Sequence, residues 1–108
     1  MNECKAETHG DLILVRVKGE VDLSWSQAIR KTILEALSKA SAVGVELSEV
    51  SYIDSSGIAA LVEGFQTARG KGQKFALVAS SASVKAVLQL ARLDRVFPMV
   101  DNADAVKG

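Results

Sequence analysis

The segment LSEVSYIDSSG, residues Leu47–Gly57, marks the change from a predicted strand to a predicted helix. Before it and at its start, apolar residues alternate with small or polar ones, which is the period of a strand: Val43, Val45, Leu47. After it, apolar residues recur at the spacing of one helix face: Ile58, Leu61, Val62, Phe65. We therefore expect a loop through residues 51–54 and a helix that begins at Ser55 or Ser56.

Upstream of this segment the sequence predicts two strands and one helix. Residues 3–9 and 12–17 read as strands that are joined by a tight turn at Gly10-Asp11. The second strand has apolar residues on both faces, which indicates a central strand covered on two sides. A helix should run from Ser24, a residue type preferred at the N-cap, to about Ala40. Its inner face consists of residues at helical spacing: Trp25, Ala28, Ile29, Thr32, Ile33, Ala36, Leu37.

Downstream, the second helix should end before Gly70, and a short buried strand is expected at 75–78. A third helix is indicated by one apolar stripe: Val84, Val87, Leu88, Ala91. The last strand, within residues 96–100, belongs at a sheet edge because Pro98 has no N–H to donate. A helical turn is expected at 102–106. This order predicts a single α/β domain over residues 1–108, with a mixed sheet of four to five strands flanked by about four helices.

Composition narrows the range of functions. The 108 residues carry thirteen basic and thirteen acidic groups, and this balance argues against nucleic acid, whose binding needs a basic surface. Cys4 is the only cysteine and His9 the only histidine, which excludes an intrachain disulfide, a thiolate zinc cluster and a paired-histidine metal site. No apolar run approaches the ~20 residues of a membrane span, and the first thirty residues lack the apolar core of a signal peptide. We expect a cytoplasmic protein with no membrane insertion, no metal and no cofactor.

Two adjacent hydroxyl residues lie at the predicted start of the second helix. Asp54, Ser55 and Ser56 are residue types that cap helices, because they can satisfy the unpaired N–H groups of the first turn. The same position suits a phosphoacceptor or an anion, since a helix N-terminus tolerates added negative charge. From the residues alone, simple capping and a phosphoacceptor role both remain open.

Three segments along the chain resemble the STAS domain family. The central one is VSYIDSSG, residues 50–57. The upstream Gly19–Asp22 is similar to the Gly-Glu-aliphatic-Asp element of that family, and residues 83–88 and 93–97 resemble its last helix and strand. The resemblance covers nearly the whole chain in the right order. One departure is Ala91-Arg92, where many members carry a glycine.

Within that family the chain resembles the free-standing bacterial anti-sigma-factor antagonists, which implies a regulatory binding protein without catalysis of its own. In that subgroup a partner kinase, which is also the anti-sigma factor, phosphorylates the hydroxyl residue directly after the loop aspartate. By position this residue is Ser55. The resemblance also implies that four residues contact the partner: Asp22, Asp54, Ser56 and Gly57. We expect both carboxylates to lie in water, with little to pack against, and to contribute more to recognition than to folding.

Two other functions remain as alternatives. Similar small STAS proteins serve as cytoplasmic subunits of lipid-transport ABC complexes, in which the same helix start docks on another subunit without phosphorylation. The sequence does not separate this role from the antagonist, since both use a hydroxyl at or near Ser55. An enzyme would need Asp22 and Asp54 as paired carboxylates beside Ser55, but the sequence offers no second base or oxyanion arrangement for it.

Overall fold

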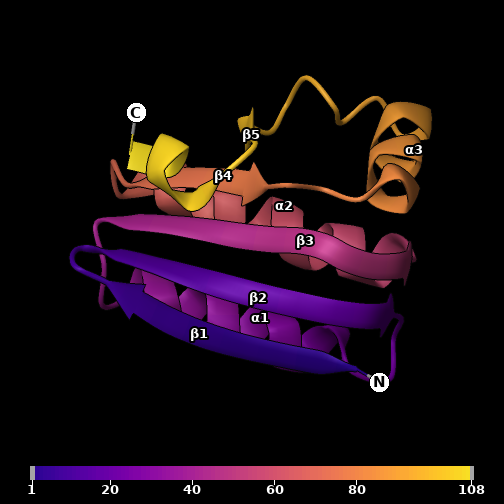
Figure 1. The fold of residues 1–108 in the computed structure, drawn as a ribbon, viewed down its shortest axis with the longest axis horizontal. Helices are drawn as coiled ribbons and strands as arrows, with labels where there is room; N and C mark the ends of the chain where they lie inside the picture. The colour runs from indigo at the N-terminus through magenta and orange to yellow at the C-terminus, as the bar shows by residue number, and fades with distance from the viewer. Residues whose placement is uncertain (1, 108) are drawn as a thin grey trace.

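A five-stranded sheet in the order β1-β2-β3-β4-β5 forms the frame of the protein. The computed structural model describes residues 2–107. Its elements are β1 (Glu3–His9), β2 (Leu12–Val21), α1 (Ser26–Leu37), β3 (Ala42–Ile53), α2 (Ser55–Gly70), β4 (Lys74–Val78), α3 (Ala82–Leu90), β5 (Met99–Val100) and the 3-10 helix η1 (Ala103–Lys107). β1 is antiparallel to β2, and every other neighbouring pair is parallel. The predicted α/β fold with a mixed sheet is confirmed (Figure 1).

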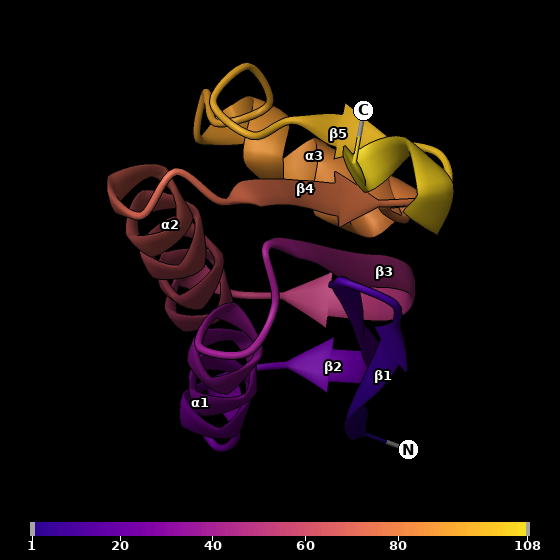
Figure 2. The same cartoon turned by 90° about the vertical axis from the view of Figure 1, so that its left-hand side faces the viewer.

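The two faces of the sheet are covered differently. α1 and α2 lie against one face, and η1 lies on the other (Figure 2). The large core on the helix side includes Val15, Ile33, Val45, Leu61, Leu77 and Leu88. A smaller core under η1 consists of Leu12, Leu14, Ala42, Ala76, Val78 and Val106. β2 contributes apolar side chains to both cores, as its sequence predicts.

α1 and α2 pack closely because α2 presents a glycine where the helices meet. A Cβ on Gly64 would lie 2.7 Å from Cγ2 of Ile33, which is too close for any real side chain. Arg30 of α1 and Glu63 of α2 form a two-point ion pair, with both N–O distances at 2.7 Å. The two helices are thereby held side by side over the sheet, with their starts at the carboxyl ends of β2 and β3.

β2 and β3 are longer than local alternation predicts. β2 continues to Val21, and β3 runs to Ile53 through the segment expected to be a loop. The extension exists because residues 18–21 pair with residues 49–53 past two irregularities in register. Gly19, at φ +96°, lies beside one of them and adopts a conformation that glycine allows. This pairing joins distant segments, so a local pattern does not reveal it.

α1 begins at Ser26 and not at Ser24. The Ser24 N–H donates to Oδ1 of Asp22 at 2.9 Å, so Ser24 belongs to a turn before the helix. The N-cap position falls on Trp25, which makes no side-chain capping bond. The expectation of a serine cap was wrong because Asp22 competes for the same backbone.

β5 is shorter than expected. Only Met99–Val100 pair with β4, since the chain before them turns back through a 3.0 Å bond from the Val96 N–H to the Leu93 carbonyl. β5 is nevertheless the edge strand beside Pro98, as predicted. α3 ends at Leu90, so Ala91 lies outside the helix and is exposed.

Candidate functional site

The candidate site lies where β2 and β3 end side by side. Val21 is paired with Ile53, and the N–H of Asp54 donates to the Val21 carbonyl at 3.0 Å. The loops after both strands therefore start together, with Asp22 on one and Asp54 on the other. In open parallel sheets this carboxyl edge is where ligands bind. The structure thus brings the predicted site residues to one edge.

Asp54 is the N-cap of α2. Its Oδ1 accepts the N–H groups of Ser56 at 2.9 Å and Gly57 at 3.1 Å, and also the Ser56 hydroxyl at 2.5 Å. The hydroxyl bond and then these N–H groups, with the Leu23 N–H, hold the pKa of Asp54 below its ordinary value, although desolvation opposes them. Asp54 was expected to lie in water with little to pack against, but it is half-buried and its carboxylate is held by the first turn of α2. It stabilises the helix start.

The two serines at the start of α2 differ in their surroundings. Ser56 is half-buried and donates its hydroxyl to Asp54. Ser55 is exposed at the first position of the helix, and within residues 2–107 its hydroxyl forms no hydrogen bond that would have to be broken. The helix begins where the sequence predicts, and Ser55 is the more accessible nucleophile of the pair.

Gly57 lies beneath the surface. It is buried, and a Cβ there would come within 2.6 Å of Cγ1 of Val21 and 2.7 Å of Cγ1 of Ile53. Only glycine lets the first turn of α2 approach the ends of the two strands this closely. Its predicted contact with a partner remains a prediction, and the structure gives it a packing role.

Asp22 organises the loop between β2 and α1. It is half-buried, its Oδ1 accepts the Ser24 N–H, and its carbonyl accepts the N–H of Ser26 at 3.0 Å. The indole N–H of Trp25 donates to the carbonyl of Glu20, and the indole packs against the core. These bonds fix the loop beside the start of α2.

Two exposed apolar side chains flank the carboxylates, and the sequence analysis did not single them out. Leu23 is 71% exposed next to Asp22, and Tyr52 is 51% exposed two residues before Asp54. Both are large apolar groups beside polar residues, which is the composition of many protein-binding surfaces. Tyr52 lies within the segment 50–57 and Leu23 directly after Gly19–Asp22, but the sequence pattern does not show that both side chains are exposed.

The chain matches the family model described as STAS domain over residues 3–106. It is 26% identical over 102 residues to an anti-sigma F factor antagonist from Paenibacillus polymyxa, covering 93% of this chain and 87% of that protein. No helix of residues 2–107 is long and apolar enough to cross a membrane.

Solved structures share the fold. An anti-sigma factor antagonist from Mycobacterium paratuberculosis superposes with a TM-score of 0.86 at 25% identity, over 99% of this chain and 92% of that one. SpoIIAA, an anti-sigma factor antagonist and Bacillus cell fate determinant, has been solved unphosphorylated and phosphorylated. Its unphosphorylated form gives a TM-score of 0.81 at 19% identity, over 97% of this chain and 93% of that one.

Proposed function

This chain belongs to the STAS domain family, and on that premise we propose that it is an anti-sigma-factor antagonist of the cytoplasm. In this role it binds an anti-sigma factor that is also a serine kinase, and it is released when that kinase phosphorylates Ser55. The chain acts by binding and performs no catalysis. The similarity to the Paenibacillus antagonist, across most of both chains, supports this role.

One observation carries the assignment to Ser55. Its hydroxyl is exposed at the first residue of α2, whereas the hydroxyl of Ser56 is held by Asp54. Phosphorylation of Ser56 would remove the hydroxyl hydrogen that is donated to Asp54, but phosphorylation of Ser55 leaves this bond in place. SpoIIAA, which shares this fold, has a phosphorylated form.

A phosphate on Ser55 would change binding and not folding. It adds about −1.5 to −2 charge and three acceptor oxygens. The N-terminus of α2 accommodates negative charge with a stabilisation of roughly 0.3–1 kcal/mol. A partner, however, must desolvate the dianion next to the carboxylates of Asp22 and Asp54. A penalty of about 3–4 kcal/mol weakens binding ~100–1,000-fold, which is enough for release.

The partner surface combines apolar anchors with negative charge. Leu23 and Tyr52 offer exposed apolar area, and Asp22 and Asp54 supply carboxylates beside it. A complementary partner presents a basic rim around an apolar groove. The carboxylate of Glu49 is less available to such a partner than those of Asp22 and Asp54, because it already pairs with Lys18 at 3.2 Å.

The test is site mapping after phosphorylation. The chain is used to capture its partner from the native cell, and the purified kinase is incubated with ATP and wild type, Ser55→Ala or Ser56→Ala. We expect mass spectrometry to find phosphate on Ser55 in wild type and Ser56→Ala, and none in Ser55→Ala. Phosphate on Ser56 would move the switch by one residue. Capture of an ABC ATPase or permease, with no phosphate at either serine, would favour the transport-subunit role instead.

A further inference from the structure

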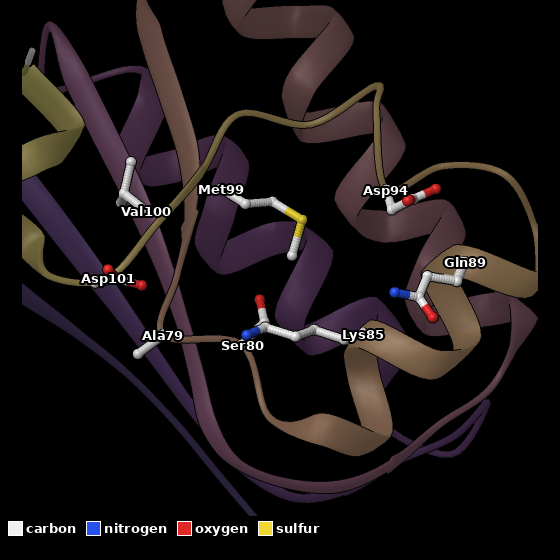
Figure 3. A pocket seen from close by; sticks show the side chains of 8 residues that line it. All are labelled: Ala79, Ser80, Lys85, Gln89, Asp94, Met99, Val100 and Asp101. Atoms are coloured by element: carbon white, nitrogen blue, oxygen red, sulfur yellow. The ribbon is translucent and has the colours of Figure 1, made fainter.

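A cavity of about 310 Å³ opens between α3, the end of β4 and β5 (Figure 3). It lies at the same carboxyl edge of the parallel sheet as the candidate site, but at the other end of the strand order. The residues that line it come from four separate segments of the chain. None of them belongs to the site described above.

Ser80 places a polar group without a partner in this cavity. The residue is only 9% exposed, and its hydroxyl finds no hydrogen-bond partner within the described residues. Figure 3 shows the Ser80 oxygen on the cavity side of the residue, next to the end of the Lys85 side chain, and the oxygen itself is buried. Buried hydroxyls are normally hydrogen-bonded, and the exceptions require an explanation. A ligand supplies the missing partner when the end of the Lys85 side chain, which lies beside Ser80, moves to bind it.

Opposite charges face this cavity without neutralising one another. Lys85 extends from α3 toward Ser80, whereas Gln89 and Asp94 lie on the opposite side (Figure 3). No salt bridge joins Lys85 to Asp94 or to Asp101 in residues 2–107. The cavity therefore presents one ammonium group, on Lys85, and two carboxylates, with Asp94 near Gln89 and Asp101 on the side of Ala79 (Figure 3). Lys85 forms its cationic pole and Asp94 the anionic pole on the opposite side, and both are free to pair with a ligand.

The wall between the poles is apolar and the floor is held in place. Met99 projects into the space between Lys85 and Asp94 (Figure 3). The floor is fixed by two bonds to neighbouring strands, since the Ala79 N–H donates to the Val100 carbonyl at 2.8 Å and the Ser81 hydroxyl to the Val50 carbonyl at 2.6 Å.

Ala79 also has a left-handed backbone, with φ at 51°. Non-glycine residues held in this conformation occur preferentially at ligand sites, and a fixed floor lowers the entropy lost on binding.

We propose that this cavity binds a small zwitterion whose two charges are separated by an apolar spacer. The anionic end pairs with Lys85 and the Ser80 hydroxyl, the spacer packs on Met99, and the ammonium end pairs with Asp94 and the Gln89 amide oxygen. An ω-amino acid and a short peptide with free termini share this chemistry. The volume is near the lower end for ligand pockets and suits molecules of this size. The proposal does not depend on the proposed function.

The test is a titration of the nitrogen-15-labelled chain followed by NMR. The probe is ε-aminocaproate, and its matched analogues are caproate and hexylamine, which each lack one charge. We expect saturable shifts at the amides of residues 79–81 and 101, with half-saturation below about 10 mM, and at least about tenfold weaker binding of each analogue. A parallel titration compares the dipeptide Ala-Leu with its N-acetylated amide. The tighter binder of ε-aminocaproate and Ala-Leu indicates whether the cavity suits an ω-amino acid or a short peptide.

Substitutions test which residue binds each charged end of the probe. Lys85→Met and Asp94→Asn should each weaken binding about tenfold or more, and Ser80→Ala should weaken it less. The matched controls are Lys71→Met and Asp104→Asn, at exposed positions outside the cavity, and they should bind as wild type. Unchanged melting temperatures show that the variants fold. Absence of saturable shifts with both free-ended probes, binding of caproate or hexylamine as tight as that of ε-aminocaproate, or wild-type binding by both pole variants would overturn the proposal. None of these results depends on a kinase.

Discussion

The N–H of Asp54 donates to the carbonyl of Val21 over 3.0 Å, so the residue that caps α2 is anchored to the last residue of β2. The side chain of Val21 also packs against Gly57 in the first turn of the helix. The start of α2 is therefore fixed to the end of β2 by one hydrogen bond and one packing contact, and the exposed Ser55 lies between the two residues that make them. A modification there is expected to change the surface and leave the fold intact.

The cap itself should contribute measurable stability. Asp54→Ala removes the acceptor for two N–H groups and the Ser56 hydroxyl, and we expect a loss of about 0.5–2 kcal/mol in urea unfolding. Asp54→Asn retains a capping oxygen and should cost only a small part of that. Equal losses in the two variants would mean that the charge of Asp54, and not its capping geometry, stabilises the helix.

Acid should remove the charge-dependent part of this contribution. The pKa of Asp54 is lowered in the folded state, so the folded protein binds the proton less readily than the unfolded chain does. The stabilisation is present above the ordinary value of 3.8 and is lost as pH falls through the folded pKa. The stability difference between wild type and Asp54→Asn should shrink as pH falls below 3.8. A difference that stays constant from neutral to acid pH would contradict the shift.

Gly57 should resist substitution for steric reasons. Gly57→Ala places a methyl group within 2.7 Å of both Val21 and Ile53, and we expect a loss of about 1–3 kcal/mol from displaced side chains. Gly70→Ala is the matched control, because it lies at the other end of α2 with open space around it. It should change stability by less than about 0.5 kcal/mol or improve it through helix propensity. A tolerated Gly57→Ala would show that the strand ends can move away.

The helix-side core should be sensitive to truncation on both helices. Ile33 and Leu61 are at most 1% exposed, and replacing either with Ala should cost about 2–4 kcal/mol through lost burial and a cavity. Leu90, which is 87% exposed, is the control, and Leu90→Ala should lose less than about 0.5 kcal/mol. Urea melts measure all three. A small loss at Leu61 would indicate that α2 packs in another rotation.

Carboxylates at the site should affect recognition of the proposed partner. In the double variant Asp22→Asn, Asp54→Asn the amide oxygens can still accept the N–H groups of the Asp22 turn and of the α2 cap, so its melting temperature should stay near wild type. We expect kinase binding to weaken roughly tenfold at low salt, mainly through a slower association rate. Added salt should slow the association of wild type in the same way, because it screens these charges. Asp104→Asn on η1 is the charge-matched control and should bind normally. Wild-type kinetics in the double variant would remove both carboxylates from the interface.

Local sequence patterns were sufficient for the order of elements and for the start of α2. Periods of two and of about four identify strands and helices because each element buries one face, and Pro98 predicts an edge because it cannot donate to a neighbouring strand. The segment Asp54–Gly57 predicts a helix start, since its residue types satisfy unpaired N–H groups within one turn. All of these depend on neighbours in the chain.

Only the tertiary structure decided how distant segments meet. β2 reaches Val21 because β3 offers it hydrogen-bond partners, and this pairing places the exposed Tyr52 opposite Glu20 at the edge of the site. The cap is anchored to the end of β2 through the Asp54 N–H and the Val21 carbonyl, and this contact exists only because the two strands pair to their ends. Ser80, Lys85 and Asp94 form one cavity only after α3 folds across the ends of the strands. Packing and long-range hydrogen bonds determine these relationships, and no local pattern in the sequence encodes them.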